Sequence, residues 1–282
     1  MQAAVLLFLK GVYALSNMLR VKFLRGENTK FVSHLDLMRS FERAIRRAGL
    51  PLAYSHGFNP HPSMVFGLPL SVGVSSESEY MDIELTEEVD KDLFLSKINE
   101  ALPEGLKCLE AKHFEEKGNI MKEIAFASYD ILASFEGVGA DEIERTVEEL
   151  KNTENIIVQK EGKNGVKDMD IKPLILEVAF GLPKASSKGS VYFKENTGLL
   201  NKRGDYSIKY IEEVKKSSWS LSYAPDKVYL FSILCSAGSQ ANMKPELFIS
   251  AMGKVLDRNI KVIKVHRTGL FIKKNEGVFA PI

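Results

Sequence analysis

Cysteine is scarce in this chain of 282 residues, which has only Cys108 and Cys235. The two lie far apart in the sequence, and each falls in an apolar run typical of a strand. Closely spaced thiolates are therefore missing, which excludes an iron–sulfur cluster held by this chain and a structural zinc site. Buried thiols in a reducing compartment are the ordinary interpretation, so we expect a cytoplasmic protein with no metal and no cofactor of its own.

Long hydrophobic runs are also missing. The apolar stretch at residues 3–9 is too short to span a bilayer, so we expect no association with a membrane. Lys10 follows this stretch, whereas a signal peptide carries its positive charge before the apolar run. We therefore interpret residues 1–17 as an upstream start or an added leader.

An excess of charge of one sign is absent overall, with 38 basic and 37 acidic residues. The charges are nevertheless segregated along the chain. Eight basic residues stand against three acidic ones between 20 and 62, and seven against one between 253 and 274, while residues 77–92 are strongly acidic. This pattern favours a basic stripe that attracts a polyanion, although solvated faces without a partner remain an alternative.

A well-marked helix begins after Phe31. Ser33 is a good N-cap because its hydroxyl can accept from the backbone N–H of Asp36, and Gly49 and Pro51 end the helix. The apolar face consists of Leu37, Phe41, Ala44, Ile45 and Ala48. The polar face carries a ridge of four arginines, namely Arg39, Arg43, Arg46 and Arg47.

A stiff loop follows this helix, with the sequence LAYSHGFNPHP. Pro60 and Pro62 restrict the backbone, and Gly57 permits a tight bend. The loop bears the polar side chains of Tyr54, Ser55, His56, Asn59 and His61. Polar groups held at low entropic cost are typical of a recognition or catalytic loop, whereas a plain connection with structural histidines is the alternative.

The run KFVSHLDLMRSFERAIRRAGLPLAYSHGFNPHP, continued by MVFGLPLSVGVSSESEYMDIEL, resembles the radical-SAM-associated family of bacterial proteins, which has no established function. The resemblance is strong over residues 18–85 and weaker at 169–175, 238–252 and 265–272. Members of that family are typically encoded beside, or fused to, a radical S-adenosylmethionine (SAM) protein, often near ribosomal-protein and ribonuclease genes. The resemblance implies a radical SAM protein as partner and an association with RNA or ribosome components. This chain is not itself the radical enzyme, which needs three closely spaced cysteines.

Hydrophobic periodicity predicts an α+β fold of two tandem ferredoxin-like domains, each with the order β-α-β-β-α-β and an antiparallel sheet. We place the first domain at 18–122 and the second at 123–282, with a polar insertion near 183–222. The strands expected in the second domain are residues 129–135, 155–160, 227–236 and 260–266, and its helices are residues 141–151 and 245–256.

Three functions remain open. The first is a non-catalytic accessory protein that binds ribosomal or transfer RNA and presents it to a radical SAM enzyme. The second is a metal-independent endoribonuclease resembling the enzymes that process CRISPR repeats, for which the acid–base candidates are His34, His56, His61 and Tyr54. The third is a pure protein-interaction module. The residues expected to bind RNA or a partner are Arg39, Arg43, Arg46, Arg47, Tyr54, His56, Asn59, His61, Lys264 and Arg267.

Overall fold

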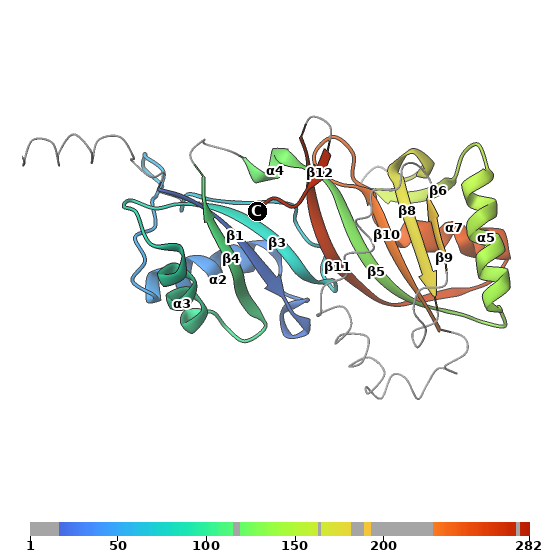
Figure 1. Ribbon diagram of the computed structural model, residues 1–282, viewed down its shortest axis with the longest axis horizontal. Helices are drawn as coiled ribbons and strands as arrows, with labels where there is room; N and C mark the ends of the chain where they lie inside the picture. The colour runs from blue at the N-terminus through green and yellow to red at the C-terminus, as the bar shows by residue number, and fades with distance from the viewer. Residues whose placement is uncertain (1–16, 115–118, 163–164, 182–188, 193–227, 275–276) are drawn as a thin grey trace, which may run out of the picture. The chain divides into compact units, whose positions relative to one another are not determined.

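The computed structural model shows a mixed α+β protein with a large, mostly antiparallel sheet (Figure 1). It divides into two compact units, and in their described parts the first contains residues up to 72 and 79–122, and the second residues 73–78 and 123–281. The structure describes residues 17–114, 119–162, 165–181, 189–192, 228–274 and 277–282. The predicted leader, apart from Asn17, and the predicted insertion, apart from 189–192, lie outside the described residues.

The first unit has its elements in the order predicted for it. They are β1 (Met18–Arg25), the 3₁₀ helix η1 (Glu27–Thr29), α2 (His34–Arg47), β2 (Met64–Phe66), β3 (Ser75–Glu84), α3 (Lys91–Ala101), β4 (Leu106–His113) and α4 (Ile120–Glu123). The hydrogen-bonded order is β4-β1-β3, and β2 pairs with β3. The first strand of the unit therefore lies between its fourth and its third strand.

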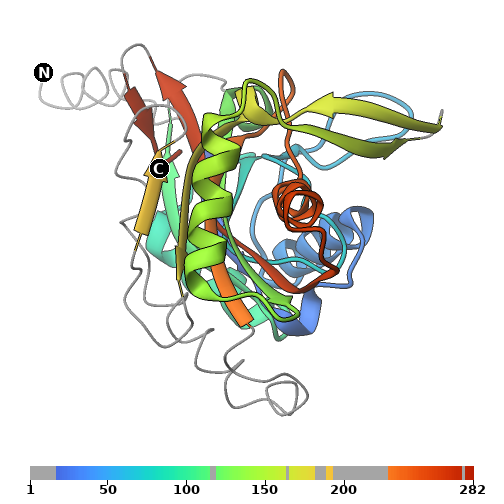
Figure 2. The same cartoon turned by 90° about the vertical axis from the view of Figure 1, so that its right-hand side faces the viewer.

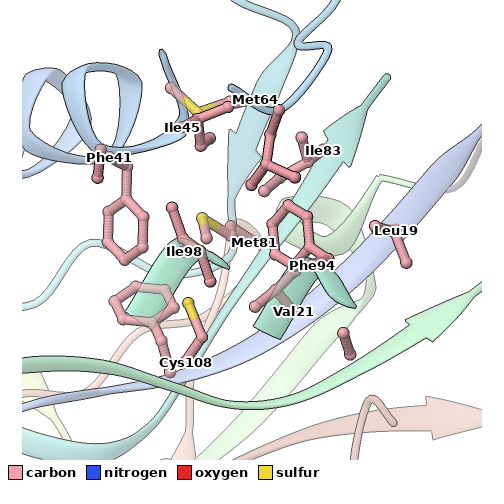
Figure 3. Packing of buried hydrophobic residues seen from close by; sticks show 14 of the residues in the cluster. Leu19, Val21, Phe41, Ile45, Met64, Met81, Ile83, Phe94, Ile98 and Cys108 are labelled. Atoms are coloured by element: carbon pink, nitrogen blue, oxygen red, sulfur yellow. The ribbon is translucent and has the colours of Figure 1, made fainter. Parts of the chain in front are cut away.

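Local signals define α2 as expected. Ser33 Oγ accepts from the backbone N–H of Asp36 at 3.2 Å and donates to its carboxylate at 2.7 Å. The helix ends at Arg47, and Gly49 follows in the left-handed region with φ of +64°. The buried face of α2, with Phe41 and Ile45, packs onto the sheet (Figure 3). The rings of Phe41 and Phe23 meet edge-on with centroids 4.8 Å apart. This packing leaves the opposite face of α2 in solvent.

The second unit is built around five further strands of the sheet. Its elements are β5 (Ile124–Phe135), α5 (Ala140–Asn152), β6 (Ile157–Gly162), β7 (Gly165–Asp170), the 3₁₀ helix η2 (Lys172–Leu174), β8 (Ile175–Gly181), β9 (Gly189–Tyr192), β10 (Val228–Ser236), α7 (Glu246–Leu256), β11 (Ile260–Lys274) and β12 (Gly277–Phe279). The strands pair in the order β11-β5-β10-β8-β9. The aromatic core includes Phe135 and Phe231, whose ring centroids are 5.7 Å apart.

The strand predicted at residues 155–160 differs from the structure in its bounds and in its place in the fold. It overlaps β6, and within the described residues β6 pairs only with β7, in a separate two-stranded sheet. The sheet position beside β10 is occupied by β8, whose pairing with β10 is antiparallel. An alternating pattern predicts a strand but does not determine with which other strand it pairs, which explains the difference.

The second unit also contains one parallel strand pairing. Ser75 and Ser76 at the start of β3 belong to the second unit, where they pair in parallel with His266 and Arg267 of β11. Ser75 Oγ lies 2.9 Å from His266 Nδ1, and both side chains are buried. The start of β3 therefore adds a short parallel pairing to the otherwise antiparallel pairs of β11 in the second unit.

Gly238, which follows β10, should tolerate no side chain. Its φ is +110°, and an added Cβ would lie 2.2 Å from the carbonyl oxygen of Ile124. We expect Gly238→Ala to lower the free energy of unfolding by about 2–3 kcal/mol, because backbone strain and overlap add. Urea denaturation followed by circular dichroism measures this loss.

Gly137 provides the matched control. It also has a positive φ, +72°, but no atom lies within 4 Å of the position of its Cβ. Gly137→Ala should cost only about 1 kcal/mol, the strain of a left-handed residue alone. Equal losses for the two substitutions would contradict the overlap at Gly238.

Candidate nucleic-acid interface

Helix α2 presents its arginines to solvent as its spacing predicts. Leu37, Phe41, Ala44 and Ile45 are buried against the sheet. The side chains on the opposite face are exposed, and these are Leu35, Asp36, Arg39, Arg43, Arg46 and Arg47. Four of these six are arginines, so the helix carries a mainly basic face on the surface of the first unit.

The four arginines differ in their contacts. Arg47 Nη2 donates to the carbonyl oxygen of Ala101 at 2.5 Å and so caps the end of α3. Arg39 Nη1 forms an exposed ion pair with Asp36 at 3.4 Å. Arg43 and Arg46 have no hydrogen-bond or ion-pair partner among the described residues. These last two guanidinium groups are the most available for binding an anion.

The loop at residues 55–61 is closed at its neck. Tyr54 and Pro62 form an isolated antiparallel bridge, and the backbone N–H of Ser55 donates to the carbonyl of His61 at 2.8 Å. The N–H of His61 in turn donates to Ser55 Oγ at 2.9 Å. His56, Asn59 and His61 are exposed above this neck, and Gly57 has φ of +131°. The loop is thus a projecting lobe with a constrained base.

A single contact places this lobe beside the basic face. The hydroxyl of Tyr54 donates to Glu42 Oε1 of α2 at 3.4 Å. Glu42 lies three residues after Arg39 and four before Arg46, which is neighbouring spacing on a helix surface. The structure therefore brings the loop and the arginines close together on the first unit.

Phe58 is a residue of this surface that the sequence analysis did not single out. It is fully exposed at the tip of the lobe. Phe31, just before α2, is also exposed, and Lys30 Nζ lies 5.2 Å from its ring centroid. The signal for Phe58 was its position between Gly57 and Asn59 in a loop with no apolar periodicity. Exposed rings next to arginines suit the stacking of unpaired bases.

Buried Arg25 holds the segment that leads into α2. Its guanidinium donates to the carbonyl oxygens of Thr29 at 3.1 Å and Lys30 at 3.0 Å, and also to that of Val32. Three carbonyls are satisfied by one side chain, so the position of Phe31 relative to α2 is well defined.

The three histidines proposed for a nuclease differ in environment. His34, in the first turn of α2, is half-buried with its ring centroid 5.5 Å from that of Phe66. Burial, reinforced by the charge of Arg25, lowers the pKa of His34 and favours its neutral form. His56 and His61 lie in the exposed lobe, and no hydrogen bond in the described structure joins either of them to His34.

The other two predicted binding residues belong to β11 in the second unit. Lys264 is half-buried. Arg267 is only 2% exposed, and its Nε and Nη2 donate to the hydroxyl of Tyr129 at 3.2 and 3.1 Å. Arg267 is therefore a core residue of its unit, which conflicts with its prediction as a surface contact.

The described residues also bear on three other features, namely a reactive cysteine, a metal site and a membrane-spanning helix. Burial raises the pKa of the thiol of Cys108 and raises that of Cys235 to about 12, so neither is a ready nucleophile. Within the described ranges, no group of three or more His, Cys, Asp or Glu side chains is placed to hold a metal ion. Of the helices that the structure describes, none is both long and apolar enough to cross a membrane.

Comparison with known proteins gives one family match. The model of a family described as an uncharacterised protein conserved in bacteria (DUF2344) matches residues 18–204. Among solved structures, a protein of unknown function from Galdieria sulphuraria is 9% identical over 87% of this chain and 96% of its own length, with a TM-score of 0.22. No protein with a curated description matches the chain.

Proposed function

The chain belongs to the family of uncharacterised proteins conserved in bacteria (DUF2344), and from this premise we propose that it is a non-catalytic accessory protein that binds RNA. The RNA is ribosomal or transfer RNA, and a cytoplasmic radical SAM enzyme is the partner to which it is presented. The partner follows from the resemblance of residues 18–85 to radical-SAM-associated proteins. The binding surface consists of the basic face of α2 and the lobe at residues 55–61.

One observation carries this proposal. Arg43 and Arg46 are exposed without a partner in the described structure, and the Tyr54–Glu42 contact at 3.4 Å places beside them a lobe tipped by Phe58. Guanidinium groups bind phosphates, and an exposed ring offers a platform on which a base stacks. Proteins that bind single-stranded RNA combine these two elements.

The strand order supports a finer assignment of the fold. In each unit the first strand, β1 or β5, lies between the last and the third strands of a β-α-β-β-α-β order, if the β6–β7 ribbon and the short edge strands β9 and β12 are set aside. We propose that each of the two units is a ferredoxin-like domain. Such domains are a recurrent platform for RNA.

The lobe gives a test that separates binding from cleavage. We expect the purified chain, incubated with labelled cellular RNA and a chelator, to retain RNA without cutting it. Phe58→Ala should weaken retention by about 1–3 kcal/mol, the usual contribution of one stacked base. Nitrocellulose filter binding measures the affinity, and a denaturing gel shows the length of the RNA.

Phe279 provides a control for Phe58, since it is another exposed phenylalanine, on β12 of the second unit. Phe279→Ala should leave RNA affinity unchanged. Discrete cleavage products that disappear in His56→Ala or His61→Ala would instead establish a nuclease. Absence of RNA binding even at low salt would overturn the proposal and favour the protein-interaction module.

A further inference from the structure

The β6–β7 ribbon stands apart from the main sheet. Residues Ile157–Gly162 pair with Gly165–Asp170 in a separate two-stranded sheet, and Figure 2 shows this ribbon extending away from α5. Six residues per strand give a length of about 20 Å. Because an isolated hairpin is only marginally stable in water, its attachment decides whether it stays extended.

The base of the ribbon is firmly attached to the second unit. Ile156, Val158 and Ile171 are buried. The carboxylate oxygen Oδ1 of Asp170 accepts from the backbone N–H groups of Ile156 at 2.9 Å and Lys172 at 3.0 Å. Apolar burial and these hydrogen bonds together fix the direction in which the ribbon leaves the unit.

The two faces of the ribbon differ in charge. Lys160 is directly opposite Lys167, and Gln159 is directly opposite Asp168. Opposite residues of an antiparallel pair share a face, and neighbours along a strand alternate, so the two lysines lie together on one face. Lys167 is exposed, Lys160 is half-exposed, and neither has a carboxylate partner among the described residues.

The opposed Lys160 and Lys167 lower the stability of the ribbon in the free protein. Like charges directly opposite each other destabilise a two-stranded ribbon, and an anion between them removes the repulsion. The phosphate groups of a nucleic acid are such anions, and contacts with them need no particular base sequence.

We propose that the lysine face of the β6–β7 ribbon is a second contact with the sugar–phosphate backbone of the RNA. This inference rests on the proposed function and assigns to the second unit a phosphate contact of its own. The ribbon contributes affinity and orientation, while the lobe at residues 55–61 contacts bases.

The test compares salt dependence in the full chain. Neutralising the pair in Lys160→Gln/Lys167→Gln removes two phosphate contacts. We expect the slope of log K against log salt to become shallower by about 1.4–1.8, and affinity near 0.1 M salt to fall about 25- to 60-fold. The probe is the cellular RNA fraction retained by the wild-type protein, measured by filter binding at several salt concentrations.

Two variants control for unrelated effects. Lys273→Gln/Lys274→Gln removes two exposed lysines of the same unit, at the end of β11, and should leave the slope unchanged. Lys160→Arg/Lys167→Arg keeps the charge and should also keep the slope. The melting temperature of the glutamine variant should stay the same or rise, because repulsion between the lysines is lost.

The possible failures are distinguishable. If the wild-type protein retains no RNA, the proposed function itself fails, and this inference with it. If the wild-type protein binds RNA and the glutamine variant has the same slope, only the role of the ribbon is overturned. The role of the ribbon is also overturned if the slope of log K against log salt falls by the same amount in the arginine variant or in the β11 control. The charge of the two ribbon lysines would then not explain the change in slope.

Discussion

Asp82→Asn should lower the free energy of unfolding by about 3–5 kcal/mol, the usual cost of removing one partner of a buried ion pair. Asp82 Oδ1 lies 2.7 Å from Arg20 Nε, and Oδ2 lies 2.9 Å from Nη2. Oδ2 also accepts from the backbone N–H of Ile120 at 3.0 Å. Because both side chains are buried, the substitution leaves the guanidinium charge of Arg20 without its carboxylate in a medium that solvates it poorly.

Urea denaturation followed by circular dichroism measures this loss. Glu148→Gln is the matched control, because Glu148 forms an ion pair with Lys151 at 3.8 Å on the surface of α5. That exposed pair should contribute less than about 1 kcal/mol. Replacing both members of the buried pair by apolar residues, as in Arg20→Met/Asp82→Leu, should recover part of the stability lost in Asp82→Asn. A loss at Asp82 no larger than at Glu148 would contradict this account.

Arg43→Glu/Arg46→Glu should reduce RNA affinity about a hundredfold at low salt. Each lost phosphate contact removes a counterion-release contribution, and each new carboxylate repels the backbone. For the binding that remains, the slope of log K against log salt should be shallower by about 1.4–1.8. Both side chains are exposed, so the fold should persist, with a cost of about 0.3–1 kcal/mol for Arg46 at the end of α2.

A matched charge reversal on α5 tests whether the α2 surface or the overall charge of the protein determines RNA affinity. Arg145 and Lys151 lie on the polar side of α5 in the second unit. Arg145→Glu/Lys151→Glu changes the net charge by the same amount and should have little effect on RNA affinity. Equal losses for the two double variants would mean that overall charge, and not the surface of α2, determines binding.

The sequence by itself determined α2 and the cap at its start. Ser33 caps this helix by accepting from the backbone N–H of Asp36, three residues ahead. Such contacts join near neighbours in the chain, and the apolar spacing of Leu37, Phe41 and Ile45 marks the buried face. The exposure of Arg43 and Arg46 follows from the same spacing.

Only the tertiary structure decided which strands pair and which charged residues of the strands are buried. The sequence predicts a strand at 155–160, close to β6 at Ile157–Gly162, but it does not show that β6 pairs with β7 while β8 takes the place beside β10. Arg267 looks like a surface base in a basic segment, yet strand register places it opposite Tyr129 in the interior. Phe58 illustrates the converse, since its neighbours in the sequence indicate a loop but do not tell whether its ring is exposed or packed in the core. Local propensity and capping are encoded within a few residues, whereas register and burial depend on the whole packed chain.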